Sequence, residues 1–199
     1  MRVALTGGIA TGKSVVGRAL REAGLAVVDA DRLARDAVGP GSAGLAAVVA
    51  RFGRGVLRAD GTLDRAALGA LVFVDGAARR ELERIVHPVV RAGIDAFFGA
   101  LPHGQPGVAE IPLAYETGWA AAFPAVVVVA CRPDTQRRRL MERDRLSFEA
   151  AQHRLDAQWP IADKVRLADA VVLTEGEVAS TLWQAARLAE WIRDRCRPS

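Results

Sequence analysis

Cysteine and long apolar segments are scarce in this sequence of 199 residues. Cys131 and Cys196 are too few for a disulfide framework and match no metal-binding spacing. The longest apolar run, residues 120–131, is interrupted by Pro124 and is too short to span a bilayer. The N-terminal residues lack the apolar core of a secretion signal. We therefore expect a cytoplasmic protein in a reducing compartment, without a membrane partner.

Lysine is also scarce, although the chain is basic. The formal net charge is +4 and the pI is near 9.8, yet only Lys13 and Lys164 among 27 basic residues are lysines. A solvated, arginine-rich surface explains most of this charge, and a cleft that attracts polyphosphates is the functional alternative. No aromatic-interleaved basic segment and no zinc-finger spacing supports nucleic-acid binding. We expect no nucleic-acid partner.

Short apolar runs alternate with longer amphipathic stretches, which predicts an α/β fold with a mainly parallel sheet. The strand cores are nearly continuous Val, Ile, Leu and Ala, as expected where helices cover both faces of a sheet. The five predicted strands are residues 2–6, 25–29, 107–111, 125–130 and 170–173. A first helix is predicted from Lys13 to about Gly24. A closing helix over residues 177–194 is predicted to bury one apolar stripe, composed of Val178, Leu182, Ala185, Ala189 and Ile192.

The connection between the second and third strands is longer than a simple crossover requires. Residues 31–101 have a helical pattern with turn signals at 39–41, 60–61 and 75–76. Insertions of this kind often carry the acceptor site of an enzyme. We therefore interpret this segment as a helical insertion that binds the acceptor.

Residues 7–14 read Gly-Gly-Ile-Ala-Thr-Gly-Lys-Ser, a complete G-x-x-x-x-G-K-[ST] motif between a predicted strand and a predicted helix. The backbone N–H groups of such a P-loop bind phosphate oxygens, and the helix N-terminus adds partial positive charge. Lys13 is expected to reach the β and γ phosphates, and the Ser14 hydroxyl to bind Mg²⁺. The alternative is a glycine-rich turn without a ligand. The candidate nucleotide-binding residues are Gly8, Ile9, Ala10, Thr11, Gly12, Lys13, Ser14 and Val15.

The motifs that read guanine in GTPases are missing, since the sequence has no N/T-K-x-D and no D-x-x-G switch after a strand. A small-molecule kinase needs instead a carboxylate at the acceptor and arginines at the phosphates. Asp29 and Asp31 follow the second strand, and strand alternation places both on one side at its carboxyl end. One would orient or deprotonate the acceptor, and the other would assist Mg²⁺ or substrate. The alternative role for either is a helix cap.

An arginine-rich segment follows the fourth predicted strand, at residues 132–145. If this segment is helical, Gln136, Arg139 and Arg143 share one face. The planar guanidinium group binds phosphate oxygens with two hydrogen bonds, which suits a lid that closes over a nucleotide. A solvated helix face is the alternative. We define residues 132–165 as the lid.

Together these residues resemble the dephospho-CoA kinase family, over residues 3 to about 188. The segment 29–35, Asp-Ala-Asp-Arg-Leu-Ala-Arg, resembles the family's D-A-D-x-[IL]-A-R, and residues 111–116, Ile-Pro-Leu-Ala-Tyr-Glu, resemble P-L-L-[FY]-E. The sequence also has His87-Pro88 and the family's lid residues Gln136, Arg139, Arg143, Gln158 and Lys164. It departs from the family at three positions, Ala10 for Gly, Ala114 for Leu and Thr174 for Asn.

The resemblance implies a three-layer P-loop NTPase fold with a parallel five-stranded sheet, in a single kinase domain over residues 1–199. It implies phosphoryl transfer from ATP to the ribose 3′-hydroxyl of dephospho-CoA, which gives coenzyme A and ADP. The implied catalytic residues are Lys13, Asp31, Arg139 and Arg143. The implied acceptor-binding residues are Asp29, Asp31, Arg35, His87 and Glu116. His87 has the alternative of packing or capping before Pro88 at a helix start, and Glu116 that of capping a helix.

Two other functions remain as alternatives at this point. One is a different P-loop kinase, which acts on a nucleoside monophosphate or a small alcohol. The other is a nucleotide-driven switch for a macromolecular partner. The pair Asp29 and Asp31 favours an enzyme over a nucleotide-driven switch, because a switch needs no acceptor base. We expect a monomer or a weak homo-oligomer.

Overall fold

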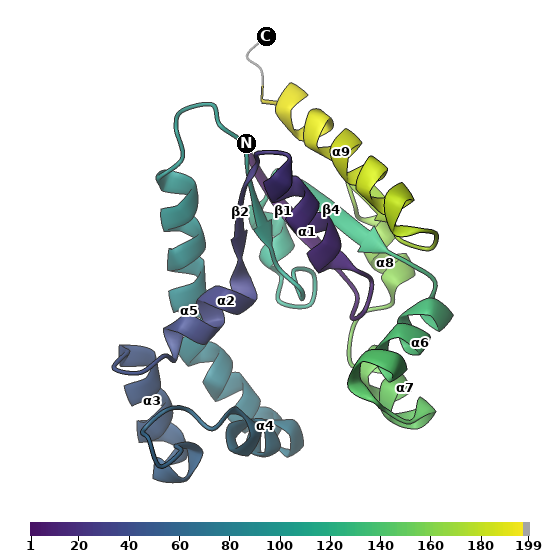
Figure 1. Cartoon of the computed structure of the whole chain (residues 1–199). Coiled ribbons are helices and arrows are strands. Elements are labelled where there is room, and N and C mark those ends of the chain that lie inside the picture. The colour runs from purple at the N-terminus through teal and green to yellow at the C-terminus, as the bar shows by residue number, and fades with distance from the viewer. Residues whose placement is uncertain (197–199) are drawn as a thin grey trace. The chain divides into compact units, whose positions relative to one another are not determined.

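The structure is a computed structural model that describes residues 1–196, and these form two compact units (Figure 1). The first unit contains Met1–Asp29 and the chain from Ala100 onward. The second unit is Ala30–Gly99, which is inserted between two strands of the first. The prediction that residues 1–199 form one kinase domain is not tested by this division and stays a prediction.

The first unit contains a parallel sheet of five strands in the order β2-β3-β1-β4-β5. These strands match the predicted ones to within one residue at each end. Their bounds are Arg2–Gly7 for β1, Ala26–Asp29 for β2, Gly107–Glu110 for β3, Ala125–Ala130 for β4 and Ala170–Leu173 for β5. Because β1 lies at the centre, the loop that follows it opens at the middle of the carboxyl edge of the sheet.

Helices cover both faces of this sheet, because successive side chains of a buried strand point to opposite sides. Val127 and Val129 of β4 pack in the cluster that includes α1 (Lys13–Glu22) and α9 (Val178–Asp194). Val128 of the same strand packs against Ile161 on α8 (Ile161–Arg166). In Figure 1, α1 and α9 lie side by side over the sheet. The predicted three-layer α/β fold is thus confirmed.

The predicted apolar stripe of α9 is right at its C-terminal half and wrong at its N-terminal half. Ala185, Ala189 and Ile192 are buried, whereas Val178 is 61% exposed and Leu182 is 40% exposed. The first turn of α9 follows closely on β5, which is the edge strand of the sheet. The end of this strand is itself exposed, so periodicity alone overestimates how far the core extends.

The second unit is helical, as predicted, and has its own small core. Gly41 and Gly61 have φ values of 76° and 80° in two of the predicted turns, a conformation that favours glycine. The core residues are Val38, Leu45, Val48, Val56, Leu63 and Leu68. Its elements are α2 (Ala30–Ala37), α3 (Ala43–Phe52), the 3₁₀ turn η1 (Arg54–Val56), α4 (Arg65–Val74) and α5 (Gly76–Gly99). That this unit binds the acceptor remains a prediction.

Pro88 lies inside α5, and not at a helix start. The expectation that His87 precedes a helix start is therefore wrong. A proline within a helix costs one backbone hydrogen bond, which is why the sequence suggested a boundary there. The pKa of His87 is lowered, chiefly because burial disfavours its charged form.

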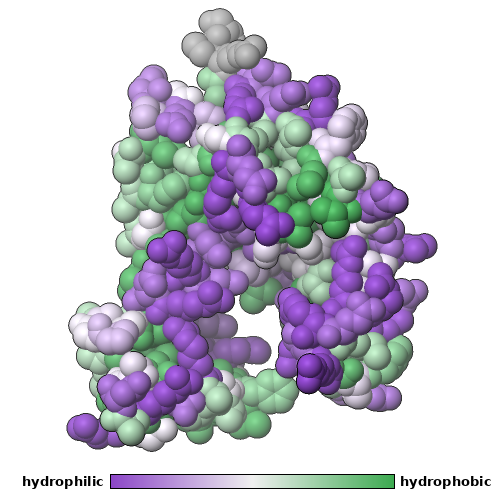
Figure 2. All heavy atoms as spheres, in the orientation of Figure 1, coloured by the Kyte–Doolittle hydropathy of each residue, from purple (hydrophilic) through white to green (hydrophobic). Residues whose placement is uncertain are grey.

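The lid of the first unit contains α6 (Pro133–Asp144), α7 (Phe148–Asp156) and α8. On the face shown in Figure 2, the region of α6 and α7 is largely hydrophilic.

Within residues 1–196 no helix has the length and hydropathy to cross a membrane. Both cysteines are free thiols, and the described chain gathers no group of three or more His, Cys, Asp or Glu that is placed to hold a metal ion.

Candidate active site

The P-loop (residues 7–14) connects β1 to α1 and depends on its glycines. Gly12 has a φ of 85°, and Gly7 lies so close to β4 that a Cβ atom there would be 2.5 Å from the carbonyl oxygen of Val129. Ala10 also has a positive φ, of 60°, which a residue with a side chain rarely adopts. The position where the family often has glycine is thus a position where the backbone favours glycine.

Thr174, which follows β5, holds the P-loop through a hydrogen bond to its backbone. Its hydroxyl donates a hydrogen bond to the carbonyl oxygen of Thr11 at 2.6 Å, and it is almost fully buried. Arg139 on α6 donates to the carbonyl oxygen of Thr174 at 2.5 Å and to its hydroxyl at 3.2 Å. The threonine that replaces the family's asparagine therefore connects the P-loop to a predicted catalytic arginine.

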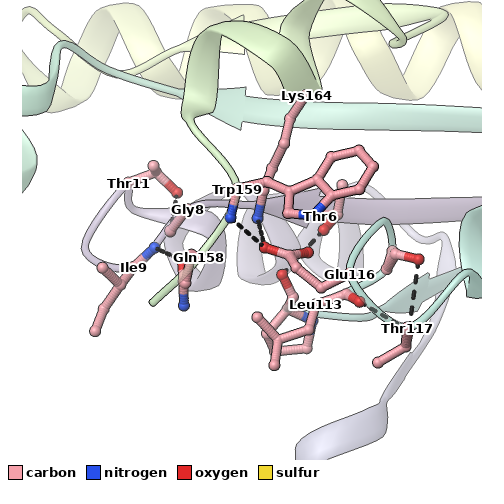
Figure 3. A network of polar contacts seen from close by, with 12 residues as sticks. Thr6, Gly8, Ile9, Thr11, Leu113, Glu116, Thr117, Gln158, Trp159 and Lys164 are labelled. Atoms are coloured by element: carbon pink, nitrogen blue, oxygen red, sulfur yellow. Dashed lines mark hydrogen bonds and ion pairs between the residues drawn. The ribbon is translucent and has the colours of Figure 1, made fainter. Parts of the chain in front are cut away.

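Two glutamines of the lid bind the backbone of the same P-loop residue, Ile9. Gln136 on α6 donates to the carbonyl oxygen of Ile9 at 2.8 Å, and the N–H of Ile9 donates to Oε1 of Gln158 at 2.8 Å. Figure 3 shows Gln158 reaching Ile9 from the segment between α7 and α8. Because Ile9 uses both its backbone groups on the lid, the position of the lid and the shape of the P-loop are coupled.

A buried ion pair holds the segment that carries Gln158. Lys164 on α8 is fully buried, and its Nζ lies 2.5 Å from Oε1 of Glu116. The backbone N–H of Trp159 donates to the same oxygen at 3.1 Å (Figure 3). The indole of Trp159 also stacks on the ring of Tyr115, with ring centres 6.2 Å apart. Glu116 therefore fixes Trp159, and through it the neighbouring Gln158, beside the P-loop.

Lys164→Met is expected to lower the free energy of unfolding by about 3–5 kcal/mol, because it leaves the carboxylate of Glu116 buried without its cation. Urea unfolding followed by circular dichroism measures this change. Arg166→Met is the matched control, since Arg166 lies on the same helix but is largely exposed, and its loss should change stability by less than about 0.5 kcal/mol. Equal stability of the two variants would show that the buried pair contributes little.

Lys13 lies in the first turn of α1 and contacts a carboxylate that the sequence did not single out. Its Nζ lies 3.3 Å from Oε2 of Glu110, and Arg21 reaches Oε1 of the same residue at 2.6 Å. Glu110 ends β3 and is buried, in register with Asp29 at the end of β2. The sequence does contain a signal for Glu110, since it is an acidic residue at the carboxyl end of a buried parallel strand. The apolar residues of that strand drew attention to the strand and not to this carboxylate.

The prediction that strand alternation places Asp29 and Asp31 on one side of a strand is wrong, because only Asp29 belongs to the strand. The strand β2 ends at Asp29, and Asp31 lies in the first turn of α2, where the helix dipole favours a carboxylate. Asp31, Arg35 and His87 all belong to the second unit, on α2 and α5. Their roles toward an acceptor stay predictions.

The predicted shared face of α6 divides into two environments. Gln136 and Arg139 contact the P-loop and its support, whereas the guanidinium of Arg143 forms hydrogen bonds with Asp144 at 2.8 and 3.2 Å and is more than half exposed. This ion pair raises the pKa of Arg143 and lowers that of Asp144. Arg143 is thus held at the outer end of the lid helix, away from the contacts of Arg139.

The start of α6 is held by Glu175, which follows Thr174. Its carboxylate accepts hydrogen bonds from the backbone N–H of Arg132 at 2.7 Å and from the hydroxyl of Thr135. These hydrogen bonds, the Thr135 contribution first, lower the pKa of Glu175 to about 2. The arginine helix is therefore attached at its N-terminus to the end of β5, beside the P-loop.

Comparison with known proteins agrees with this arrangement. The family model for dephospho-CoA kinase matches residues 1–180. The dephospho-CoA kinase of Anaeromyxobacter dehalogenans is 48% identical, over 96% of this chain and 92% of that protein, and the one of Gloeobacter violaceus is 44% identical, over 93% and 89%. The structure of dephospho-CoA kinase from Campylobacter jejuni is 28% identical, with a TM-score of 0.74 and coverage of 98% of both chains. The chain, with its P-loop and its lid glutamines, belongs to the dephospho-CoA kinase family.

Proposed function

We propose that this chain transfers the γ-phosphoryl group of ATP to the ribose 3′-hydroxyl of dephospho-CoA, giving coenzyme A and ADP. The observation that carries the proposal is the P-loop whose Ile9 is bound on both sides by lid glutamines, with Lys13 at its end. Membership of the family supports the choice of acceptor.

The P-loop residues fit a Mg²⁺-bound triphosphate. The helix α1 begins at Lys13 and has no acidic side chain in its first turn, so its N-terminus is favourable for phosphate oxygens. We propose that Ser14 provides the hydroxyl ligand for Mg²⁺, while residues 8–15 bind the phosphates. When bound, Mg²⁺ neutralises charge on the phosphate oxygens.

We propose the following roles for the other predicted residues. Asp31 orients the acceptor hydroxyl and accepts its proton, while Arg139 and Arg143 stabilise the transferring group. Asp29, Arg35 and His87 bind the acceptor. Because Oε1 of Glu116 is engaged by Lys164 and Trp159, we propose that Glu116 supports the site indirectly, through the segment that it holds.

A coupled assay of ADP release over a panel of acceptors tests the proposed function. We expect dephospho-CoA to be preferred over AMP, adenosine and pantetheine by a wide margin in kcat/KM, because remote binding energy from the pantetheine arm helps to position the hydroxyl. Equal use of AMP would favour a nucleoside monophosphate kinase. ADP formation only in the presence of a polymer would favour a nucleotide-driven switch.

Arg139→Ala and Arg143→Ala are each expected to reduce kcat more than they weaken ATP binding, since lid arginines act on the phosphoryl group in transfer. Comparable arginines contribute about 10³–10⁵ in rate. Steady-state kinetics and equilibrium ATP binding separate the two effects. Arg138→Ala is the matched control on the same helix, because Arg138 is exposed and pairs with Glu142. Variants that change ATP affinity alone, or change nothing, would show that these two arginines do not stabilise the transferring group.

We further propose that the chain acts as a monomer or weak homo-oligomer in the cytoplasm, with small-molecule substrates and no nucleic-acid partner.

A further inference from the structure

The helix α1 has a space on one side, and the carboxylate of Glu110 fills it. Lys13, Gly17 and Arg21 are four residues apart, so they lie along the same side of the helix. Gly17 is buried, and a Cβ atom there would be 2.1 Å from Oε1 of Glu110 and 2.8 Å from Oε2. Only glycine leaves room for this carboxylate between the two cations.

The two oxygens of Glu110 are divided between those cations. Oε1 accepts from Arg21 at 2.6 Å and Oε2 from Lys13 at 3.3 Å. The side chain of Glu110 is only 3% exposed, and a carboxylate so deeply buried needs at least one paired cation. The contact with Arg21 is as short as a strong charge-assisted hydrogen bond, whereas the contact with Lys13 is longer than such bonds. Arg21 is therefore the tighter partner, and Lys13 is the one more easily released.

We propose that Glu110 is a resting counterion for Lys13, and that Arg21 keeps the carboxylate compensated when Lys13 turns to the phosphates of ATP. This inference rests on the proposed function, in which Lys13 binds the β and γ phosphates. Nucleotide and Glu110 then compete for one ammonium group. Glu110 acts as a positioning residue, which holds the lysine beside the P-loop until the triphosphate arrives.

The proposed competition predicts the direction in which each variant changes the affinity for ATP. Glu110→Gln removes the competing charge, so ATP should bind about threefold to tenfold more tightly. Arg21→Met removes the tighter partner, makes the carboxylate depend on Lys13, and should weaken ATP binding by a similar factor. Isothermal titration calorimetry with ATP in EDTA measures both affinities without a divalent cation, so that any role of Glu110 toward Mg²⁺ does not enter.

Arg18→Met is the matched control for a general loss of positive charge. Arg18 lies on α1 closer in sequence to Lys13 than Arg21 does, but it is exposed and pairs with Glu22. A general effect of losing one positive charge from α1 would weaken ATP binding by Arg18→Met as well, whereas competition for Lys13 predicts no change in its ATP affinity. Arg21 is also partly exposed, so its variant provides a test even if Glu110→Gln fails to fold.

Repeating the measurements in a Lys13→Met background completes the test. The effects of Glu110→Gln and Arg21→Met on ATP affinity should disappear there, because the residue competed for is gone. Persistence of either effect, or no tightening by a folded Glu110→Gln, or no weakening by Arg21→Met, would overturn the inference. If Lys13→Met alone leaves ATP affinity unchanged, the proposed phosphate contact of Lys13 is wrong as well, which separates failure of the proposed function from failure of the counterion.

Discussion

Lys13→Ala should lower the turnover number with ATP and dephospho-CoA by at least about 10²–10³, with the fold intact. Removal of a single preorganised donor from a developing charge costs this much in well-studied sites. Arg21, the other cation that contacts Glu110, lies two turns further along α1, so it is not placed to replace the lysine. Coupled ADP release measures the turnover number, and circular dichroism verifies the fold.

Two further variants make this result specific. Arg18→Ala removes a positive charge from the same helix at an exposed position and should leave turnover unchanged. Lys13→Arg keeps the charge with a different shape, so we expect it to recover only part of the activity. Near-normal turnover of folded Lys13→Ala would contradict the assignment of the chain as a kinase of this mechanism.

Asp31→Asn should bind ATP normally yet lose kcat with dephospho-CoA by about 10²–10⁴, the usual contribution of a positioned acid or base. The amide keeps the shape of the carboxylate, but it has one acceptor oxygen instead of two and no negative charge, so it orients the hydroxyl less well and cannot accept the proton. A largely dissociative transition state requires little of a base, so orientation of the hydroxyl is the main part of the effect. Pre-steady-state transfer with saturating ATP isolates this step.

Asp29→Asn is the natural comparison for that variant. Asp29 ends β2 in register with Glu110 and belongs to the first unit, whereas Asp31 lies in the first turn of α2 and belongs to the second unit. We expect a smaller loss of kcat for Asp29→Asn. An unimpaired Asp31→Asn together with an inactive Asp29→Asn would transfer the role of acceptor base to Asp29.

The strands and the P-loop were predictable because local signals decide them. A short apolar run, Val3–Leu5, defines β1, a continuous run of valine and alanine defines β4, and the glycine-lysine motif defines the loop between β1 and α1. The lid glutamines were visible in sequence only as part of a family pattern. Their binding to Ile9 depends on side chains from residues 136 and 158, which are more than 120 positions away along the chain. No periodicity of the sequence reports such a contact.

The failed predictions also have physical causes. Strand alternation predicts that Asp31 lies on the same side as Asp29, but a helix begins at Ala30. The sequence pattern does not locate such a change from strand to helix to the exact residue. Pro88 suggests a helix start, but α5 continues through it. Glu110 was missed because its charge is compensated by two cations of another element, and compensation across elements cannot be read from spacing.

The insertion of the second unit between β2 and β3 has a consequence for the order in which the chain folds. These strands are neighbours in the sheet, yet Asp29 and Gly107 are 78 positions apart (107 − 29). Closing an unstructured loop of that length costs about 4 kcal/mol of chain entropy beyond a constant. The helices of the second unit pack on one another through residues that are closer together in the sequence, so we expect them to form before the sheet is complete. We therefore expect the edge of the sheet that carries Asp29 to be completed late, after the inserted helices have shortened the connection.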